Sequence, residues 1–98
     1  MKLSIVIPAH NEEENIGQTI SDVIAKMDKE KIDYEIVAVD DNSVDSTLKV
    51  LTELSDRCPR LRIIRRLPPK GFGRAIREGI ANINGDAVAI VMGDLSDD

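Results

Sequence analysis

The hydrophobic and polar positions of this chain follow two alternating patterns. Short apolar runs rich in Ile and Val alternate with longer stretches in which apolar residues recur every three or four positions. The short runs are typical of buried strands and the longer stretches of amphipathic helices. The pattern predicts strands near residues 3–8, 34–39, 61–65 and 87–92, with one helix in each interval between them.

Cap and turn residues place the ends of the predicted helices. Asn11 is expected to cap the first helix, because Asn accepts hydrogen bonds from the free N–H groups at a helix start. The second helix is expected over about 44–57 and is stopped by Pro59. The third helix begins near Gly73, and the turn at 84–86 follows it.

The alternation of strands and helices predicts an α/β fold. Apolar strands separated by helices form a parallel sheet with helices on both faces, and right-handed crossovers restrict its topology. The order β-α-β-α-β-α-β favours the strand order 3-2-1-4, with the partly charged strand at 61–65 on an edge. A length of 98 residues suffices for one small domain over 1–98.

Two adjacent carboxylates, Asp40 and Asp41, directly follow the second predicted strand. Open parallel sheets bind ligands at the carboxyl ends of their strands, and His10 and Asp94 follow two other strands at that edge. Asp40 and Asp41 could accept hydrogen bonds from the N–H groups of a nucleobase. The alternative role, compensation of a helix dipole and capping, is favoured for Asp45 and Ser43 but not for Asp41.

The stretch 70–74, Lys-Gly-Phe-Gly-Arg, resembles a phosphate-binding loop in outline. Its glycines allow the backbone to approach an anion closely, and the helix that follows offers free N–H groups. The stretch matches neither the dinucleotide motif nor the P-loop, so by itself it is a weak indication. Gly79, further along the same helix, is more simply explained by close helix packing.

Carboxylates also follow the last predicted strand, at Asp94, Asp97 and Asp98. Oxygen ligands of this kind suit Mg²⁺ or Mn²⁺ that is shared with a diphosphate. The alternative is an acidic tail in solvent. The ring of His10 could pack on a base, although a lone histidine in a loop is more often simply solvated.

Composition and charge narrow the possible function classes. A hydrophobic content of 42% with 32% charged residues indicates a globular protein. The net charge of −5 and the aromatic content of 2% argue against a nucleic-acid-binding protein. Residues 60–77 nevertheless hold seven of the 13 basic residues and no acid. A basic segment and an acidic sheet edge in one small domain could together bind an anionic ligand and a metal. The alternative is a solvated surface with unevenly distributed charge.

Cysteine usage and hydropathy bear on the compartment. Cys58 is the single cysteine, so neither a disulfide framework nor a thiolate zinc site is expected. The chain begins with Met-Lys and a predicted strand, without a signal-peptide pattern. No apolar run approaches the roughly 18 residues of a membrane span. The chain is therefore expected to be soluble and cytoplasmic.

Three stretches, in order, resemble the family-two glycosyltransferases of the GT-A fold. Residues 5–16 are similar to the family's opening motif, 39–47 to its acidic second motif, and 71–97 to the approach to its metal motif. The likeness covers nearly the whole chain and is strongest toward the dolichol- and polyprenol-phosphate sugar transferases. It implies the Rossmann-like, nucleotide-sugar-binding half of a GT-A catalytic domain over 1–98, with the acceptor half absent.

The resemblance also implies roles for the nucleoside-binding residues. Pro8, His10 and Glu12 would line the nucleoside pocket, and Asp41 would read the base. His10 departs from the family pattern, which commonly has Tyr at that position. The ring can still stack on a base.

At the other end of the nucleotide, Lys70, Gly71 and Arg74 would lie near the diphosphate. The resemblance implies Mg²⁺ or Mn²⁺ as cofactor. The family's metal motif commonly reads Asp-x-Asp, and here Met92 takes the first Asp position. Metal binding is therefore expected to depend on Asp94. Further ligands could come from Ser96 and Asp97.

The implied activity is inverting transfer of a hexose from GDP-mannose or UDP-glucose to a polyprenyl or dolichyl phosphate. The 98 residues would supply the nucleotide site, so the isolated chain is expected to be inactive, with the catalytic residues elsewhere in a longer protein. That protein would act at the cytoplasmic membrane face through segments absent here. The alternatives are a non-catalytic nucleotide-binding module and a receiver-like, Mg²⁺-binding signalling domain.

Overall fold

The computed structural model of the chain describes residues 1–67 and 71–92. Strands and helices alternate along it, as the hydrophobic pattern predicts. The elements are β1 (Lys2–Ala9), α1 (Ile16–Lys29), β2 (Asp33–Asp41), α2 (Thr47–Arg57), β3 (Leu61–Arg66), α3 (Phe72–Ala81) and β4 (Ala87–Ile90).

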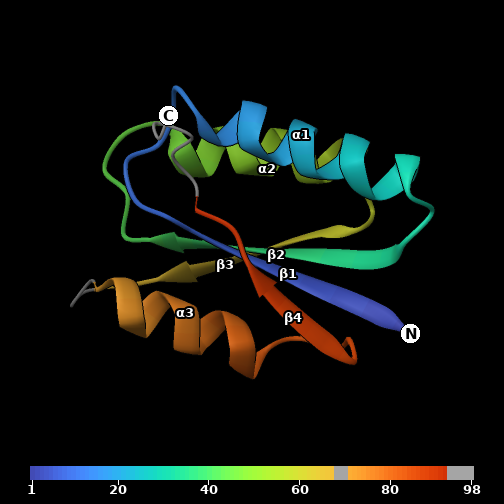
Figure 1. Ribbon diagram of the computed structural model, residues 1–98. Helices are drawn as coiled ribbons and strands as arrows, with labels where there is room; N and C mark the ends of the chain where they lie inside the picture. Colours follow the sequence, from blue (N-terminus) through green and yellow to red (C-terminus); the bar gives the residue numbers. More distant parts are fainter. Residues whose placement is uncertain (68–70, 93–98) are drawn as a thin grey trace.

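The four strands form one sheet with the order β3-β2-β1-β4, and every neighbouring pair is parallel. Ile5 of β1 lies opposite Ile36 of β2, and Ile36 lies opposite Leu61 of β3. Helices α1 and α2 cover one face of the sheet, and α3 covers the other (Figure 1). The predicted strand order, the edge position of β3 and the placement of helices on both faces are thus confirmed.

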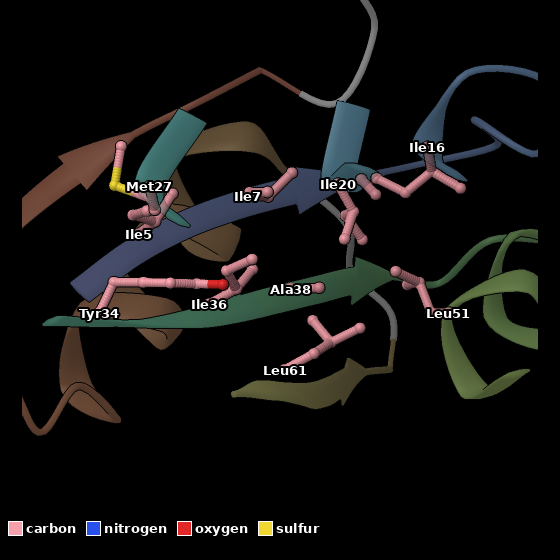
Figure 2. Packing of buried hydrophobic residues seen from close by; sticks show 11 residues of the cluster. Ile5, Ile7, Ile16, Ile20, Met27, Tyr34, Ile36, Ala38, Leu51 and Leu61 are labelled. Atoms are coloured by element: carbon pink, nitrogen blue, oxygen red, sulfur yellow. The ribbon is translucent and has the colours of Figure 1, made fainter. Parts of the chain in front are cut away.

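The larger hydrophobic core lies between the sheet and helices α1 and α2. Figure 2 shows aliphatic side chains from both central strands meeting those of the two helices. Ile7 on β1, Ile36 on β2, Ile20 on α1 and Leu51 on α2 are fully buried. Since each buried side chain of this size contributes roughly 1.5–3 kcal/mol, this layer holds α1 and α2 on the sheet.

A smaller core lies between the sheet and α3. It contains Val6, Val37 and Val39 of the central strands together with Ala75 of the helix. Helix α3 approaches the sheet closely at Gly79, where an added Cβ would lie 2.4 Å from Cγ1 of Val6. The prediction that Gly79 allows close helix packing is therefore confirmed.

Two predicted helix starts are wrong. Helix α1 begins at Ile16, and Asn11 lies in the preceding loop with a positive φ of 54°, a conformation that Asn tolerates better than most residues. Helix α2 begins at Thr47, three residues later than expected. In both loops the polar residues form hydrogen bonds with the other loop instead of extending their own helix.

Strand β4 is shorter and less buried than its apolar sequence predicts. It ends at Ile90, and its burial alternates along the strand. Ala87 and Ala89 are half-buried, whereas Val88 and Ile90 are 41% and 40% exposed. The alternation arises because β4 is the sheet's other edge, and α3 covers it only in part.

Candidate functional site

A cavity of about 360 Å³ opens at the carboxyl end of the sheet, between the ends of β1 and β2 and the start of α3. We call it the edge cavity. Its position follows from the parallel sheet, because every strand directs its carboxyl end and its following loop to this side. Its lining is Pro8, Ala9, His10, Glu12, Asp41, Gly71, Ala75 and Met92.

The structure brings most of the predicted nucleotide-binding residues together at this cavity. Pro8, His10, Glu12, Asp41 and Gly71 all line it, although they come from three separate parts of the sequence. Alternation along β1 and β2 puts Pro8 and Asp41 on the α3 face of the sheet. The other predicted residues lie elsewhere: Arg74 lines a neighbouring groove, and Lys70, Asp94, Ser96 and Asp97 fall outside the described residues.

Asp41 is held rigidly at the cavity wall. Nη1 of Arg66 lies 2.5 Å from Oδ1 of Asp41, and the backbone N–H of Gly71 donates to Oδ2 at 2.8 Å. The side chains of Asp41 and Arg66 are only 6% and 14% exposed. Because a carboxylate oxygen accepts more than one hydrogen bond, Asp41 keeps acceptor capacity toward the cavity while its orientation is set from behind.

His10 is fixed by hydrogen bonds at both ring nitrogens. Nδ1 lies 2.8 Å from the carbonyl oxygen of Asp41, which can only accept, so Nδ1 carries the hydrogen. Nε2 then accepts from Nδ2 of Asn11 at 3.3 Å. The ring therefore lines the cavity in the tautomer that these partners favour, with the hydrogen on Nδ1.

The loops 10–15 and 42–46, which precede α1 and α2, are joined by reciprocal hydrogen bonds between side chains and backbone. Thr47 Oγ1 accepts from the N–H of Glu12 at 2.7 Å and donates to Oδ1 of Asp45 at 2.5 Å. Burial alone would raise the pKa of Asp45, but the hydroxyl and N–H of Thr47 lower it below its usual range. The other bonds run from Asn11 to Ser43, Val44 to Asn11, Glu13 to Asp45 and Ser46 to Glu13.

These bonds give Asp45 and Ser43 structural roles, as the sequence favoured, and they also explain why the cavity has a defined shape. Glu12 and His10 belong to one of the joined loops, and Asp41 immediately precedes the other. The polar side chains of both loops are thus used to position the cavity wall.

Asp40 does not share the position of Asp41. It lies on the opposite face of β2, toward α1 and α2, and is completely buried. Neither of its carboxyl oxygens has a hydrogen-bond partner in the described part of the chain. The hypothesis that Asp40 binds a nucleobase is therefore wrong, because its side chain cannot reach a ligand in the edge cavity.

The residues that sequence reasoning missed are chiefly apolar or basic. Ala9 and Ala75 line the cavity without any chemical motif, and Met92, noted only for its place in the metal motif, lines it as well. Arg66 was not singled out as the partner of Asp41, although alternation along β3 puts it on the face that carries Arg62. The register that sets Asp41 opposite Arg66 is the feature that joins them, and it belongs to the folded sheet.

The predicted metal ligands Asp94, Ser96 and Asp97 lie outside the described residues. Among residues 1–67 and 71–92, no group of three His, Cys, Asp or Glu side chains is arranged to hold a metal ion. The predicted ligands begin two positions after Met92, which lines the cavity. The described residues that line the cavity therefore do not form a metal site by themselves.

None of the helices in the described part of the chain has both the length and the apolar character that a membrane span needs.

Comparison with known proteins shows the family to which the chain belongs. Residues 4–97 match the family described as "Glycosyl transferase family 2". The chain is 37% identical over 95 residues to the dolichol-phosphate mannosyltransferase of Pyrococcus furiosus, covering 97% of this chain and 26% of that protein. This chain therefore spans about a quarter of the length of that relative.

Solved structures give the same result. The S. aureus TarS 1-349 structure in complex with UDP-GlcNAc has a TM-score of 0.81 and 29% identity, covering 96% of this chain and 27% of that one. Glucosyl-3-phosphoglycerate synthase from Mycobacterium tuberculosis, in complex with Mn²⁺, UDP and its product, has a TM-score of 0.73 and 25% identity. It covers 95% of this chain and 33% of that one. The receiver-like alternative finds no support in these similarities.

Proposed function

The chain belongs to glycosyl transferase family 2, and from that premise we propose that its edge cavity binds the nucleotide of a nucleotide-sugar donor. The observation that carries the proposal is Asp41, a carboxylate at the cavity wall held by Arg66 and Gly71. Support comes from structural neighbours whose complexes contain UDP or UDP-GlcNAc.

In this proposal Asp41 accepts the hydrogen bond of a ring N–H of the base. Guanine and uracil both carry such a donor, and a charged acceptor makes the bond strong. Pro8, His10 and Glu12 form the remaining wall, with the imidazole face of His10 packing on the base or ribose. Because Asp41 is already oriented, little conformational entropy is lost when it binds.

The diphosphate lies toward the start of α3, near Lys70 and Gly71, in the same proposal. Asp94, aided by Ser96 and Asp97, holds Mg²⁺ or Mn²⁺. When bound, such an ion neutralises charge on a departing nucleoside diphosphate. Support for a divalent metal comes from the mycobacterial neighbour, whose complex contains Mn²⁺ together with UDP.

The activity proposed for the whole protein is inverting hexosyl transfer from GDP-mannose or UDP-glucose to a polyprenyl or dolichyl phosphate. An acceptor phosphate oxygen attacks the anomeric carbon from the face opposite the diphosphate, and the bond from that carbon to the diphosphate oxygen breaks. The dolichol-phosphate relative supports this acceptor class. In this proposal the chain supplies the donor site of that protein.

The test is calorimetric titration of the chain with GDP and with UDP, each with and without Mn²⁺. We expect binding that prefers one base and is strengthened by Mn²⁺. Asp41→Asn should weaken binding at least about tenfold, since one charge-assisted hydrogen bond is lost. Asp33→Asn, at the exposed amino end of β2, is the matched control and should bind normally.

Asp94→Ala separates the base site from the metal site. It should remove the effect of Mn²⁺ and keep the base preference, whereas Asp41→Asn should do the reverse. If the folded chain binds neither nucleotide, the edge cavity is not a nucleotide site in this chain. Equal losses from Asp41→Asn and Asp33→Asn would give Asp41 a structural role only.

A non-catalytic nucleotide-binding module is the second candidate. One observation favours it. Met92 lines the cavity, and it stands at the position where the family's metal motif commonly has its first Asp. Detection of sugar transfer by the whole protein would exclude it.

A further inference from the structure

A second concave surface lies next to the edge cavity, between β3 and α3. Its volume is about 390 Å³, and its lining is Arg66, Arg74, Arg77, Glu78 and Ala81. We call it the arginine groove. Asp41 lines the edge cavity and its ion-pair partner Arg66 lines the arginine groove, so the two concave surfaces are neighbours.

The fold concentrates positive charge in this groove. Arg74 and Arg77 lie three positions apart on α3 and therefore share one side of the helix. Arg66 reaches the same groove from β3. The segment 60–77, which carries seven basic residues and no acid, thus folds back so that its strand and its helix face each other.

Two carboxylates lie at or beside the groove. Asp41 is occupied by Arg66 and Gly71. Glu78 lines the groove, and its Oε2 accepts a hydrogen bond from Nδ2 of Asn82 at 3.3 Å. Arg74 and Arg77 are exposed, and neither makes a hydrogen bond or ion pair within the described residues. The groove therefore has three guanidinium groups and one carboxylate in its lining, and its net charge is positive.

Two like charges at this spacing on a helix repel each other unless an anion lies between them. A guanidinium group donates two parallel hydrogen bonds to a phosphate or carboxylate, which makes paired arginines a strong site for such groups. The groove is large enough for a phosphate group and offers the apolar surface of Ala81 beside it.

We propose that the arginine groove is a binding site for a phosphate-type dianion, held by Arg74 and Arg77. It is a separate site from the nucleotide site proposed above and does not rest on that function. The dianion can be a soluble phosphate compound or the phosphate of a lipid headgroup, which present the same chemistry to the two guanidinium groups.

The first experiment titrates the chain with inorganic pyrophosphate at low ionic strength, followed by backbone amide NMR shifts. We expect saturable shifts centred on Arg74, Arg77 and Glu78. The double substitution Arg74→Ala with Arg77→Ala should weaken binding at least about tenfold, because both forked donors are lost. Added salt should weaken binding by the native chain, since exposed charges are screened.

A matched control removes the same charge elsewhere. Lys49→Ala with Arg57→Ala takes two exposed basic residues from α2, on the opposite face of the sheet. This control should bind pyrophosphate as the native chain does. Equal weakening in both double variants would overturn the proposal, because binding would then follow net charge only. A native chain that is folded yet shows no shift would overturn it as well.

A second experiment separates the two sources of phosphate. Flotation with vesicles of phosphatidylcholine containing phosphatidic acid is compared with pure phosphatidylcholine vesicles. Flotation that requires phosphatidic acid and is lost in the α3 double variant assigns a lipid headgroup. Pyrophosphate binding without flotation assigns a soluble ligand. The single variant Arg77→Ala should retain the nucleotide binding of the native chain, so failure of one site is distinguishable from failure of the other.

Discussion

Glu35 is the centre of a buried polar network at the amino end of the sheet. The hydroxyl of Ser4 and the N–H of Asn84 donate to its Oε2, both at 2.6 Å. Nη2 of Arg62 donates to Oε1 at 2.9 Å and also to the carbonyl of Asn82. The network links the turn between α3 and β4 to the central strands. Each carboxylate oxygen of Glu35 has a hydrogen-bond donor, which compensates its buried charge.

The pH dependence of stability should reveal this network. Burial alone would raise the pKa of Glu35, but hydrogen bonds from Asn84, Ser4 and Arg62 lower it from its ordinary value of 4.5 to about 2. Because the pKa of Glu35 is lower in the folded chain, its carboxylate binds a proton more readily in the unfolded chain. The stabilisation is therefore complete above pH 4.5 and is lost as the pH falls toward 2, by about 3 kcal/mol in total.

Urea unfolding of the native chain and of Glu35→Gln between pH 7 and pH 2 measures this effect. The difference between their free energies of unfolding should be largest at neutral pH and should shrink through the acidic window. Parallel curves at all pH values would show that Glu35 is not stabilised in its charged form.

Thr47 is the residue on which the joined loops depend most, because it is fully buried and bonds to both of them. Thr47→Val keeps the shape but removes the hydroxyl that accepts from the N–H of Glu12 and donates to Oδ1 of Asp45, while the backbone N–H at position 47 still donates to that oxygen. We expect a loss of about 1–3 kcal/mol in the free energy of unfolding. Thr52→Val, whose exposed hydroxyl bonds to a carbonyl within α2, should stay within about 0.5 kcal/mol. Equal losses in both variants would contradict a special role for the loop bonds.

Among the elements, α3 depends on a close approach to the sheet. At Gly79 an added Cβ would lie 2.4 Å from Cγ1 of Val6 and 3.2 Å from Cγ2 of Val39. These methyl groups belong to central strands and cannot move away freely. Gly73, in the same helix, has no atom within 4 Å of the position its Cβ would take.

The two glycines therefore predict opposite outcomes. Gly79→Ala should lower the free energy of unfolding by about 1–3 kcal/mol, because overpacking outweighs the gain in helix propensity. Gly73→Ala should raise it by up to about 1 kcal/mol, because only the propensity gain remains. Thermal unfolding of both variants and of the native chain measures these differences in stability. A stabilising effect at both positions would mean that α3 lies further from the sheet.

At the scale of the whole molecule, the sheet is unevenly covered. Strands β1 and β2 lie in the centre with both faces buried, whereas β4 is an edge whose Val88 and Ile90 are partly exposed. Amide hydrogen exchange should therefore be slowest at Val6 and Val37 and faster by about two orders of magnitude or more in β4. Uniform protection across the strands would contradict this and indicate that β4 opens only with the whole fold.

The charge of the molecule is uneven as well. The chain carries a net charge of −5, yet α3 and β3 present Arg66, Arg74 and Arg77 to one groove. Net charge alone would therefore misrepresent this surface, because the field at short range is set by neighbouring groups and not by the sum.

The sequence by itself determined the order and type of the elements, the parallel sheet and the edge position of β3. These follow from local periodicity and from the handedness of strand-helix-strand crossovers, which act over short stretches of chain. It also picked out His10 and Asp41, because residues at the carboxyl ends of parallel strands share one edge. Pro8 and Glu12 followed from the resemblance to family-two glycosyltransferases, and Gly71 from that resemblance and from its glycine-rich loop.

Only the tertiary structure decided what depends on two distant segments meeting. The helix starts at Ile16 and Thr47 were missed because Asn11 and its neighbours bond across to the second loop instead of capping a helix. Likewise, the ion pair from Arg66 that orients Asp41 depends on strand register, and so does the burial that separates Asp40 from it. A side chain's partner is chosen by geometry across the sheet, which a periodic pattern along one segment does not contain.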